Sequence, residues 1–559
     1  MDRLWTNWFR AAATAAFVTV TLAAVAQEQT AAPVPPTPAA TPYETPILDA
    51  ATQFVPADEL PASPISYNWS PTPGGSSVPT AGPAPAPAAG VKKPAAPPAF
   101  PGPKTLPPTG PYKALFFQND FSYKKDPKHD YVFGEELKDM QSELFGETLT
   151  ISTGGEIRHR YMKEDNRLRP GGPIDADNQL WRWRHYVDAK YGDVRVYFEG
   201  IDAESFGNEA PDQAIDVNRW DIQNLFVDVL FHEGELGKHM LRYGRQELLF
   251  GRQRLVSPLD WANTRRNFEG FRYLLKGSDF TLDAFLVRPV NSATGFNSVA
   301  EFDNKFDTPN DRVDFAGTYY SYTGRKNTVL DLYWLYLDTQ IEDPTRPDGQ
   351  RHTLGSHWSY LYPITDGCGN ELRVWDFDAE GGFQVGDDNR EDVFAGFLTT
   401  IGGHTWKKAP WTPRLSGLFY YGSGDRAAGS GQNNTFDVLF PLGHAYWAIS
   451  DNLAGQNLMD YSLQADVRPT KKTALTSAVH WFNLASDGDV LYNVAGAPVG
   501  TPGNGRDVGQ ALDLYGYYAF NPNFDIQAGY SWFWYGQYID ATAPRGDATQ
   551  FYVQTSLRY

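Results

Sequence analysis

Polar and apolar side chains alternate along much of the chain after residue 150. In the stretch 181–191, Arg182 and Arg184 alternate with Trp181 and Trp183, and the same alternation runs through 461–468. A period of two over about 8–11 residues predicts a strand with one polar and one apolar face. In a transmembrane β-barrel, the apolar face meets lipid and the polar face lines the lumen.

A soluble sandwich or a soluble barrel would alternate too, so two further features decide between them. Many positions on the polar face are fully charged, and a packed soluble core accepts such residues only when they are paired. The apolar face has Trp and Tyr near the strand ends, as an interfacial belt requires. We therefore expect residues 150–559 to form an all-β, transmembrane, antiparallel up-and-down barrel of about 16–18 strands, at roughly 10 residues per strand plus loops.

The segments between these strands are rich in turn-forming residues. Stretches rich in Gly, Pro, Asn and Asp predict loops at 166–178, 203–219, 291–312, 339–370, 422–445 and 485–509. Residues 112–149 form a transitional segment, in which Leu137, Met140 and Leu144 lie at helical spacing. That spacing predicts a short helix around 135–145.

The N-terminal part has two features of an exported chain. Arg3 and Arg10 precede an apolar stretch from Ala11 to Val25, and Ala24-Val25-Ala26 matches a cleavage site, so residues 1–26 are expected to be a signal peptide cleaved near Ala26. Residues 27–111 hold 23 of the 41 prolines and are expected to be a disordered Pro/Ala-rich periplasmic segment. This segment either reaches peptidoglycan or a periplasmic partner, or is an idle linker.

The last residues, FYVQTSLRY, alternate and end on an aromatic residue. Such a strand resembles the recognition signal of the bacterial barrel assembly machinery, which we therefore expect as a partner. Together with the signal peptide, it predicts a location in the bacterial outer membrane.

Composition narrows the class of function. The formal net charge of -19 argues against a nucleic-acid binder, although it does not exclude a local basic channel. Aromatic residues make up 14% of the chain, which suits a barrel with aromatic girdles. The single cysteine, Cys368, excludes an intrachain disulfide and a cysteine-based zinc site.

Arginines are the candidate functional residues. Seven of them lie between Leu241 and Arg272, and others precede this stretch on predicted strands. Inward arginines would concentrate an anionic solute, because the guanidinium stays charged and matches carboxylates. The alternative is that they pair with inward acids such as Asp188, Glu199 and Asp228 and only hold the wall. Alternation alone gives these pore-lining candidates: Arg158, Arg160, Arg182, Arg184, Lys190 and Arg195.

The run GRQELLFGRQRLVSPLDWANTRRNFEGFR resembles the signature of the alginate-export family of outer-membrane porins. Similar pieces are VNRWDIQNLFVDVL at 217–230, LFPLGHAYW at 439–447 and the terminal FYVQTSLRY. The resemblance covers about 150–559 and implies a monomeric barrel of about 18 strands, with a narrow basic lumen that passes an anionic polyuronate by diffusion and is gated by loops or turns. It adds these motif residues, of which the arginines join the pore-lining candidates: Arg242, Arg245, Gln246, Arg252, Arg254, Asp260, Trp261, Arg265 and Arg266. Alternation puts Arg242 and Arg245 on opposite faces unless Gly244 forms a bulge.

Other functions remain open. A general anion-selective porin for small solutes is the main rival, and a structural anchor between outer membrane and cell wall is another. An enzyme is not expected, because paired carboxylates such as Asp387 and Asp388 lie in loop-like stretches and no nucleophile motif is present. We expect no catalytic residue, metal site or cofactor.

Overall fold

The structure is a computed structural model that describes residues 110–169, 175–207, 212–290, 306–340 and 348–559. The expected signal peptide and nearly all of the Pro/Ala-rich segment lie outside these residues. Among the described residues, no helix is long and apolar enough to cross a membrane.

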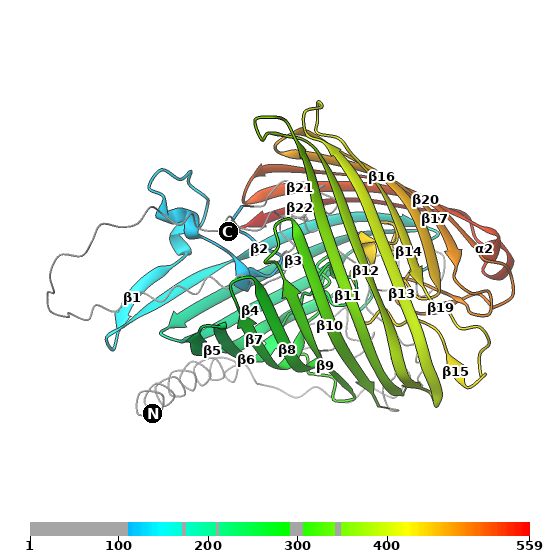
Figure 1. Ribbon diagram of the computed structural model, residues 1–559, viewed down its shortest axis with the longest axis horizontal. Coiled ribbons are helices and arrows are strands. Elements are labelled where there is room, and N and C mark those ends of the chain that lie inside the picture. The colour runs from blue at the N-terminus through cyan, green and yellow to red at the C-terminus, as the bar shows by residue number, and fades with distance from the viewer. Residues whose placement is uncertain (1–109, 170–174, 208–211, 291–305, 341–347) are drawn as a thin grey trace.

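Eighteen antiparallel strands form a closed barrel, which confirms the predicted fold (Figure 1). The barrel closes where β2 pairs with β22, from Glu156 opposite Arg558 to Asp165 opposite Thr549. The strands are β2 (Glu147–Asp165), β3 (Ala176–Tyr191), β4 (Val194–Phe206), β5 (Asn218–Gly234), β6 (Gly237–Gln246), β7 (Phe268–Lys276), β8 (Phe280–Pro289), β9 (Val313–Tyr322), β10 (Thr328–Thr339), β11 (Gly349–Thr365), β12 (Glu371–Asp388), β13 (Glu391–Trp406), β14 (Arg414–Gly422), β16 (Leu458–Thr470), β17 (Thr473–Leu484), β20 (Asp507–Asn521), β21 (Phe524–Tyr535) and β22 (Ala548–Arg558).

The two ends of the barrel differ. At one end the strands are joined by turns such as 235–236 and 471–472, and we call this the short-turn end. At the other, the long-loop end, connections such as 423–457 and 485–506 are far longer, and the connection from β21 to β22 (536–547) contains helix α2 (Gln537–Thr542). Figure 1 shows α2 at one end of the molecule and the C-terminus at the other.

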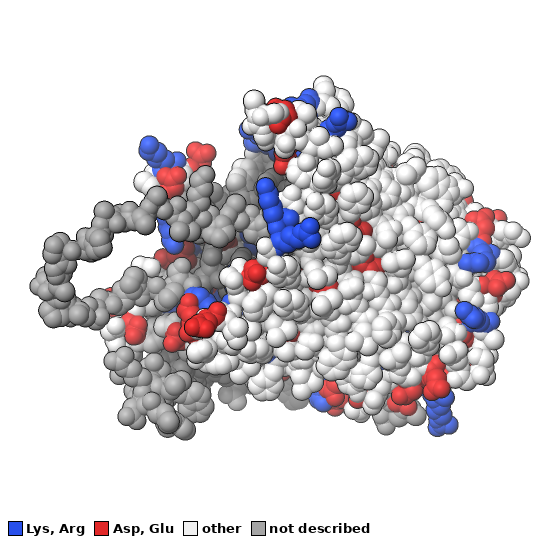
Figure 2. Space-filling view, in the orientation of Figure 1, with Lys and Arg blue, Asp and Glu red and all other residues white. Residues whose placement is uncertain are grey.

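The outer surface is apolar. On β16, the outward side chain of Leu463 is 62% exposed, whereas its inward neighbour Ser462 is 7% exposed. In the space-filling view, a broad uncharged wall separates charged side chains that gather mainly toward the edges (Figure 2). This arrangement fits a barrel whose outer face contacts hydrocarbon.

Inside the barrel, the long-loop half contains an apolar core. The connection from β6 to β7 (247–267) and the one from β14 to β16 (423–457) supply Leu248, Phe250, Phe440 and Trp447, which pack against inward residues such as Phe315. Inward positions on β8–β10 are therefore apolar near this end, and a simple apolar-out, polar-in rule does not hold there.

Three 3₁₀ turns precede the barrel: η1 (Phe116–Gln118), η2 (Ser122–Lys125) and η3 (Glu135–Leu137). The expected helix around 135–145 is wrong, because β1 (Met140–Leu144) follows η3 and pairs with β2. Phe145 and Gly146, both at positive φ, turn the chain tightly between these two strands.

The expected loop at 339–370 is also wrong in part, because β11 occupies its middle. Small and polar residues such as Gly355 and Ser356 hid this strand, which pairs along its length with β10 and β12. The remaining short elements are β15 (Gln432–Asn433), β18 (Leu491–Tyr492), β19 (Pro498–Val499) and η4 (Gly443–Ala445).

Candidate functional site

The arginine-rich motif forms the β6–β7 loop, which crosses the lumen. Near its start, Arg254 donates from Nη1 to Glu380 Oε2 at 2.7 Å and from Nη2 to Asp378 Oδ1 at 2.8 Å, both on β12. Further along, Asp260 Oδ1 accepts a hydrogen bond from Arg182 Nη2 on β3 at 2.7 Å. The loop is thus fixed to two separate parts of the barrel wall.

Trp261 anchors the middle of this loop. Its side chain is 1% exposed and stacks on His444 of the β14–β16 loop, with ring centroids 3.9 Å apart. Its Nε1–H donates to Asp451 Oδ2 at 2.8 Å. The two lumenal loops therefore support each other.

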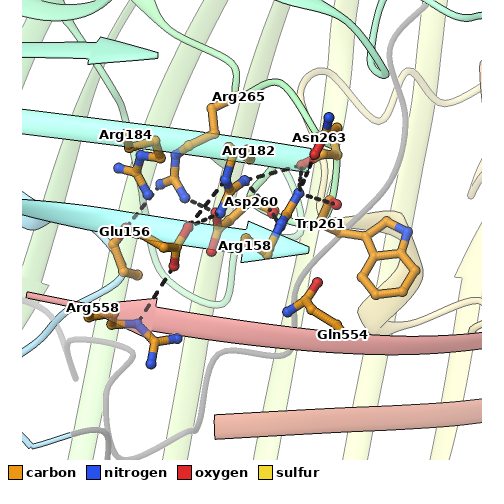
Figure 3. Close-up of polar contacts among 12 residues, drawn as sticks. Glu156, Arg158, Arg182, Arg184, Asp260, Trp261, Asn263, Arg265, Gln554 and Arg558 are labelled. Atoms are coloured by element: carbon orange, nitrogen blue, oxygen red, sulfur yellow. Dashed lines mark hydrogen bonds and ion pairs between the residues drawn. The ribbon is translucent and has the colours of Figure 1, made fainter. Parts of the chain in front are cut away.

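Arginines and acids of β2, β3, β4 and the β6–β7 loop form a buried network, which we call the arginine cluster (Figure 3). Arg182 pairs with Glu156 at 2.6 Å, and Arg184 pairs with Glu199 at 2.5 Å. Arg265 pairs with both Glu247 and Asp260. The cluster comprises Arg158, Arg160, Arg182, Arg184, Arg265, Glu156, Glu199, Glu247 and Asp260.

Charge–charge contacts set the ionisation of Asp260 in this loop. Burial opposes ionisation, but Arg265 and Arg182 overcome it and hold the pKa of Asp260 well below its ordinary value. Asp260 is therefore an anion under all ordinary conditions, and its charge is committed to the arginines.

Arg158 and Arg160 differ from the other arginines of the cluster. Within the described part of the chain, neither has a carboxylate within salt-bridge distance. Arg158 donates to the carbonyl oxygens of Asp260 at 2.7 Å and Ala262 at 2.6 Å. Arg160 donates to Gln554 Oε1 at 2.9 and 2.6 Å, and its guanidinium lies 3.5 Å from the ring centroid of Trp261.

The cluster therefore has more positive than negative charge. It contains five guanidinium groups and four carboxylates, and Arg558 with its partner Asp525 adds one of each. Arg160 also lines a small cavity of about 50 Å³ beside Trp261 and Asp451.

The other predicted residues lie elsewhere. Lys190 and Arg195 both pair with Asp188, at 3.2 and 2.7 Å, and Arg242 pairs with Asp228 at 2.7 Å. These pairs and the Arg184–Glu199 pair are the ones expected if the inward arginines only hold the barrel wall together.

Arg245 and Arg266 lie at the long-loop side. The register of β5 with β6 is unbroken from Arg242 to Arg245, so the two side chains leave opposite faces, and Arg245 contacts Asp221 and Glu269 at 3.4 Å. Arg266 lines a cavity of the long-loop end, and Arg252 contacts Asp378 at 3.0 Å.

The cavity beside Arg266 opens at the long-loop end and measures about 320 Å³. Its lining includes Arg266, Arg351, Asp388, Asn433, Trp447 and Tyr492. Deeper in the lumen, a cavity between the β14–β16 loop and the wall measures about 40 Å³. Since a water needs at least about 10–15 Å³ of such space, the deeper cavities hold only a few waters each.

Comparison with known proteins decides the family. The family model described as "Alginate export" matches residues 149–553. The chain belongs to the alginate-export family. No curated protein matches the sequence.

Several solved structures are similar to this alginate-export chain at low sequence identity. OccK5 (OpdH) of Pseudomonas aeruginosa is 13% identical, with a TM-score of 0.47 over 73% of this chain and 98% of that chain. OprD of the same organism is 12% identical, with a TM-score of 0.47 over 73% and 93%. OccAB2 of Acinetobacter baumannii is 11% identical, with a TM-score of 0.48 over 73% and 98%.

The alginate-export protein is a bacterial outer-membrane β-barrel and a porin for the passage of solutes. These statements follow from the family together with the closed barrel and its apolar outer wall. No group of three or more His, Cys, Asp or Glu side chains suited to a metal occurs among the described residues.

Sequence reasoning missed Glu247 of the arginine cluster. Alternation puts Glu156 on the same face as Arg158, and the family resemblance included Asp260, but Glu247 lies in a loop with no strand period. Asp378 and Glu380 are spaced by two on β12 and so share a face, a signal that was available. Nothing in the sequence links them to Arg252 and Arg254, because that contact depends on how the loop crosses the lumen.

Proposed function

We propose that this barrel passes an anionic polysaccharide or oligouronate, similar to alginate, through the outer membrane by diffusion, and that it acts as a channel rather than as an enzyme. The observation that supports this is the pair Arg158 and Arg160, two inward guanidiniums without a carboxylate partner, which supply the excess positive charge of the arginine cluster. Buried cations without counter-ions attract anions strongly, because the surroundings screen them little.

Ion selectivity tests this function directly. We expect openings of the refolded protein in planar bilayers under a KCl gradient to show an anion-selective reversal potential. Replacing both arginines (Arg158→Gln, Arg160→Gln) should lower the anion-to-cation permeability ratio several-fold, because the unpaired charges are removed while hydrogen-bond donors remain.

The matched control is Arg219→Gln, which removes a partly exposed arginine that pairs with Asp202 at 2.6 Å and Glu204 at 2.7 Å. This variant should keep the parent's selectivity. Cation selectivity of the parent would refute the proposal.

A general pore for small anions is the second candidate, and the small deeper cavities favour it. A hexameric oligogalacturonate separates the two. Current block by micromolar oligomer supports polymer passage, whereas anion-selective current without block supports the general pore.

A further inference from the structure

The chain's own segment 111–118 lies inside the barrel at the short-turn end. Leu115, Phe116 and Phe117 are at most 4% exposed. They pack against inward Tyr186 of β3, Tyr197 of β4 and Phe226 of β5, and against Leu249 of the β6–β7 loop. On this side of the barrel, the segment therefore fills the lumen from the short-turn end, and the β6–β7 loop fills it from the long-loop end.

The three wall aromatics form a continuous stacked row. Tyr186 and Tyr197 have centroids 5.8 Å apart at 18°, and Tyr197 and Phe226 have centroids 5.2 Å apart at 17°. Phe117 meets the row edge-on, 5.2 Å from Phe226. Flat aromatic faces of this kind also pack well against the C–H face of a pyranose ring.

Four arginines surround the same segment, three from the wall and Arg265 from the β6–β7 loop, and each also pairs with one carboxylate or more. Phe116 lies 4.1 Å from the guanidinium of Arg184, and Phe117 lies 4.6 Å from that of Arg242. Ala114 O accepts a hydrogen bond from Arg265 Nη2 at 2.9 Å, and Phe117 O accepts one from Arg195 Nη2 at 2.7 Å.

The acceptors that the segment offers to Arg195 and Arg265 are neutral carbonyls. A carboxylate in the same place would accept the same hydrogen bonds and would add the attraction between two opposite charges. The segment therefore occupies a position in which an acidic sugar would interact more strongly.

The segment is attached in a way that permits release. Gln118 N–H donates to Leu115 O at 2.8 Å within the segment, and Asp120 N–H, just after the segment, donates to Pro111 O at 3.0 Å. Strands β3, β4 and β5 pair with one another, with two irregularities of register between β4 and β5. The segment can therefore leave without opening the strand ladder of the wall.

We propose that residues 111–118 are a displaceable plug, which occupies a binding site for uronate carboxylates and sugar rings at the short-turn mouth. The site consists of Tyr186, Tyr197 and Phe226 with Arg184, Arg195, Arg242 and Arg265. The ligand class rests on the proposed function, whereas the plug itself does not. A uronate chain that enters from the short-turn end replaces the segment and opens the pore.

The plug is tested by conductance in KCl without any polysaccharide. The full-length double variant Phe116→Ala, Phe117→Ala loses the side chains that seat the segment, and we expect its time-averaged current to exceed the parent's at least tenfold. The matched control is Tyr131→Ala, Phe133→Ala, two exposed aromatics (65% and 55%) of the same N-terminal region. The folding of both proteins is checked by heat-modifiable gel migration. Equal currents from the folded parent and the folded Phe116/Phe117 variant would overturn the proposal that the segment is a plug.

The shared site is tested by cysteine labelling. In a Cys368→Ser background, Leu115→Cys should resist a membrane-impermeant maleimide and should react several-fold faster when hexameric oligogalacturonate is added. Labelling that the oligomer leaves unchanged would overturn the uronate site. Cation selectivity of the open Phe116/Phe117 variant would instead refute the proposed function and leave the plug standing.

Discussion

At the residue scale, the inner wall uses arginine in two ways. Arg182 contacts two carboxylates, Glu156 and Asp260, and so fixes the β6–β7 loop to the wall. Arg158 contacts the same loop only through carbonyl oxygens and keeps an unneutralised charge. Breaking a buried ion pair leaves a lone charge and costs about 3–5 kcal/mol, so the paired arginines mainly stabilise the structure. The unpaired arginines mainly set the electrostatic potential of the lumen.

Lys138 gives a pH-dependent contact beside the plug. Its side chain is 1% exposed, and its Nζ donates to Tyr559 O at 3.0 Å and to Thr153 O. Burial, with the nearby charge of Lys124, lowers the pKa of Lys138 to about 8. Between pH 8 and about 10.4, Lys138 therefore binds fewer protons while it is buried against the barrel than when it is released to solvent. Docking of the N-terminal segment that carries Lys138 becomes more favourable as the pH rises through this window.

We expect this gain to be on the order of 3 kcal/mol between pH 8 and 10.4. This gain in docking free energy can be measured by amide hydrogen exchange of residues 112–118. The parent and Lys138→Met are compared at equal pH. The parent's protection should rise relative to the variant's as the pH increases. A constant ratio would show that Lys138 is not the group responsible.

At the element scale, the β12–β13 hairpin depends on one glycine. Gly386 has a φ of +150°, and a Cβ there would overlap the carbonyl oxygen of Gln350 on β11. Residue 386 must therefore be glycine for two reasons: its φ is positive, and β11 comes too close to leave room for a Cβ.

Gly386→Ala should therefore lower the free energy of unfolding by roughly 2–4 kcal/mol, measured by urea denaturation in lipid vesicles. Gly402→Ala on β13 is the control, because its Cβ would meet nothing within 4 Å and its φ is not positive. Equal effects of the two variants would contradict the argument.

The β6–β7 loop explains why the element pattern could be predicted only in part. Alternation identified strands such as β3 and β16, because inward and outward positions differ in their surroundings. The motif residues from Arg252 to Arg266 carry no such period, since they touch opposite walls through side chains. Their contacts depend on barrel closure, which no local pattern encodes.

The same reason limits prediction of the site. The arginines of β2 and β3 were recognisable from their spacing, and so were acids such as Glu199. The segment 111–118 was not, because its apolar residues have no period that distinguishes a plug from a linker.

At the scale of the whole molecule, lipid and lumen impose opposite demands on neighbouring residues. Leu463 lies near the middle of β16 and faces outward. We expect Leu463→Arg to lower the free energy of unfolding in vesicles by about 2–4 kcal/mol, because it places a charge near the bilayer midplane.

Leu236→Arg is the comparison for this change. Leu236 is 64% exposed and lies in the turn between β5 and β6, outside the hydrocarbon. This variant should unfold like the parent in tryptophan-fluorescence titrations. A similar loss in both variants would mean that the wall around Leu463 does not face lipid.

The contact between Lys138 and Tyr559 joins residues 421 positions apart. Tyr559 also exchanges backbone hydrogen bonds with Gly155, at 2.9 and 3.1 Å, at the seam between β2 and β22. The seat of the N-terminal segment is therefore complete only after the last strand has met the first. In the order of assembly, the earliest part of the described chain is the last to reach its place, and the pore becomes sealable only once its wall is whole.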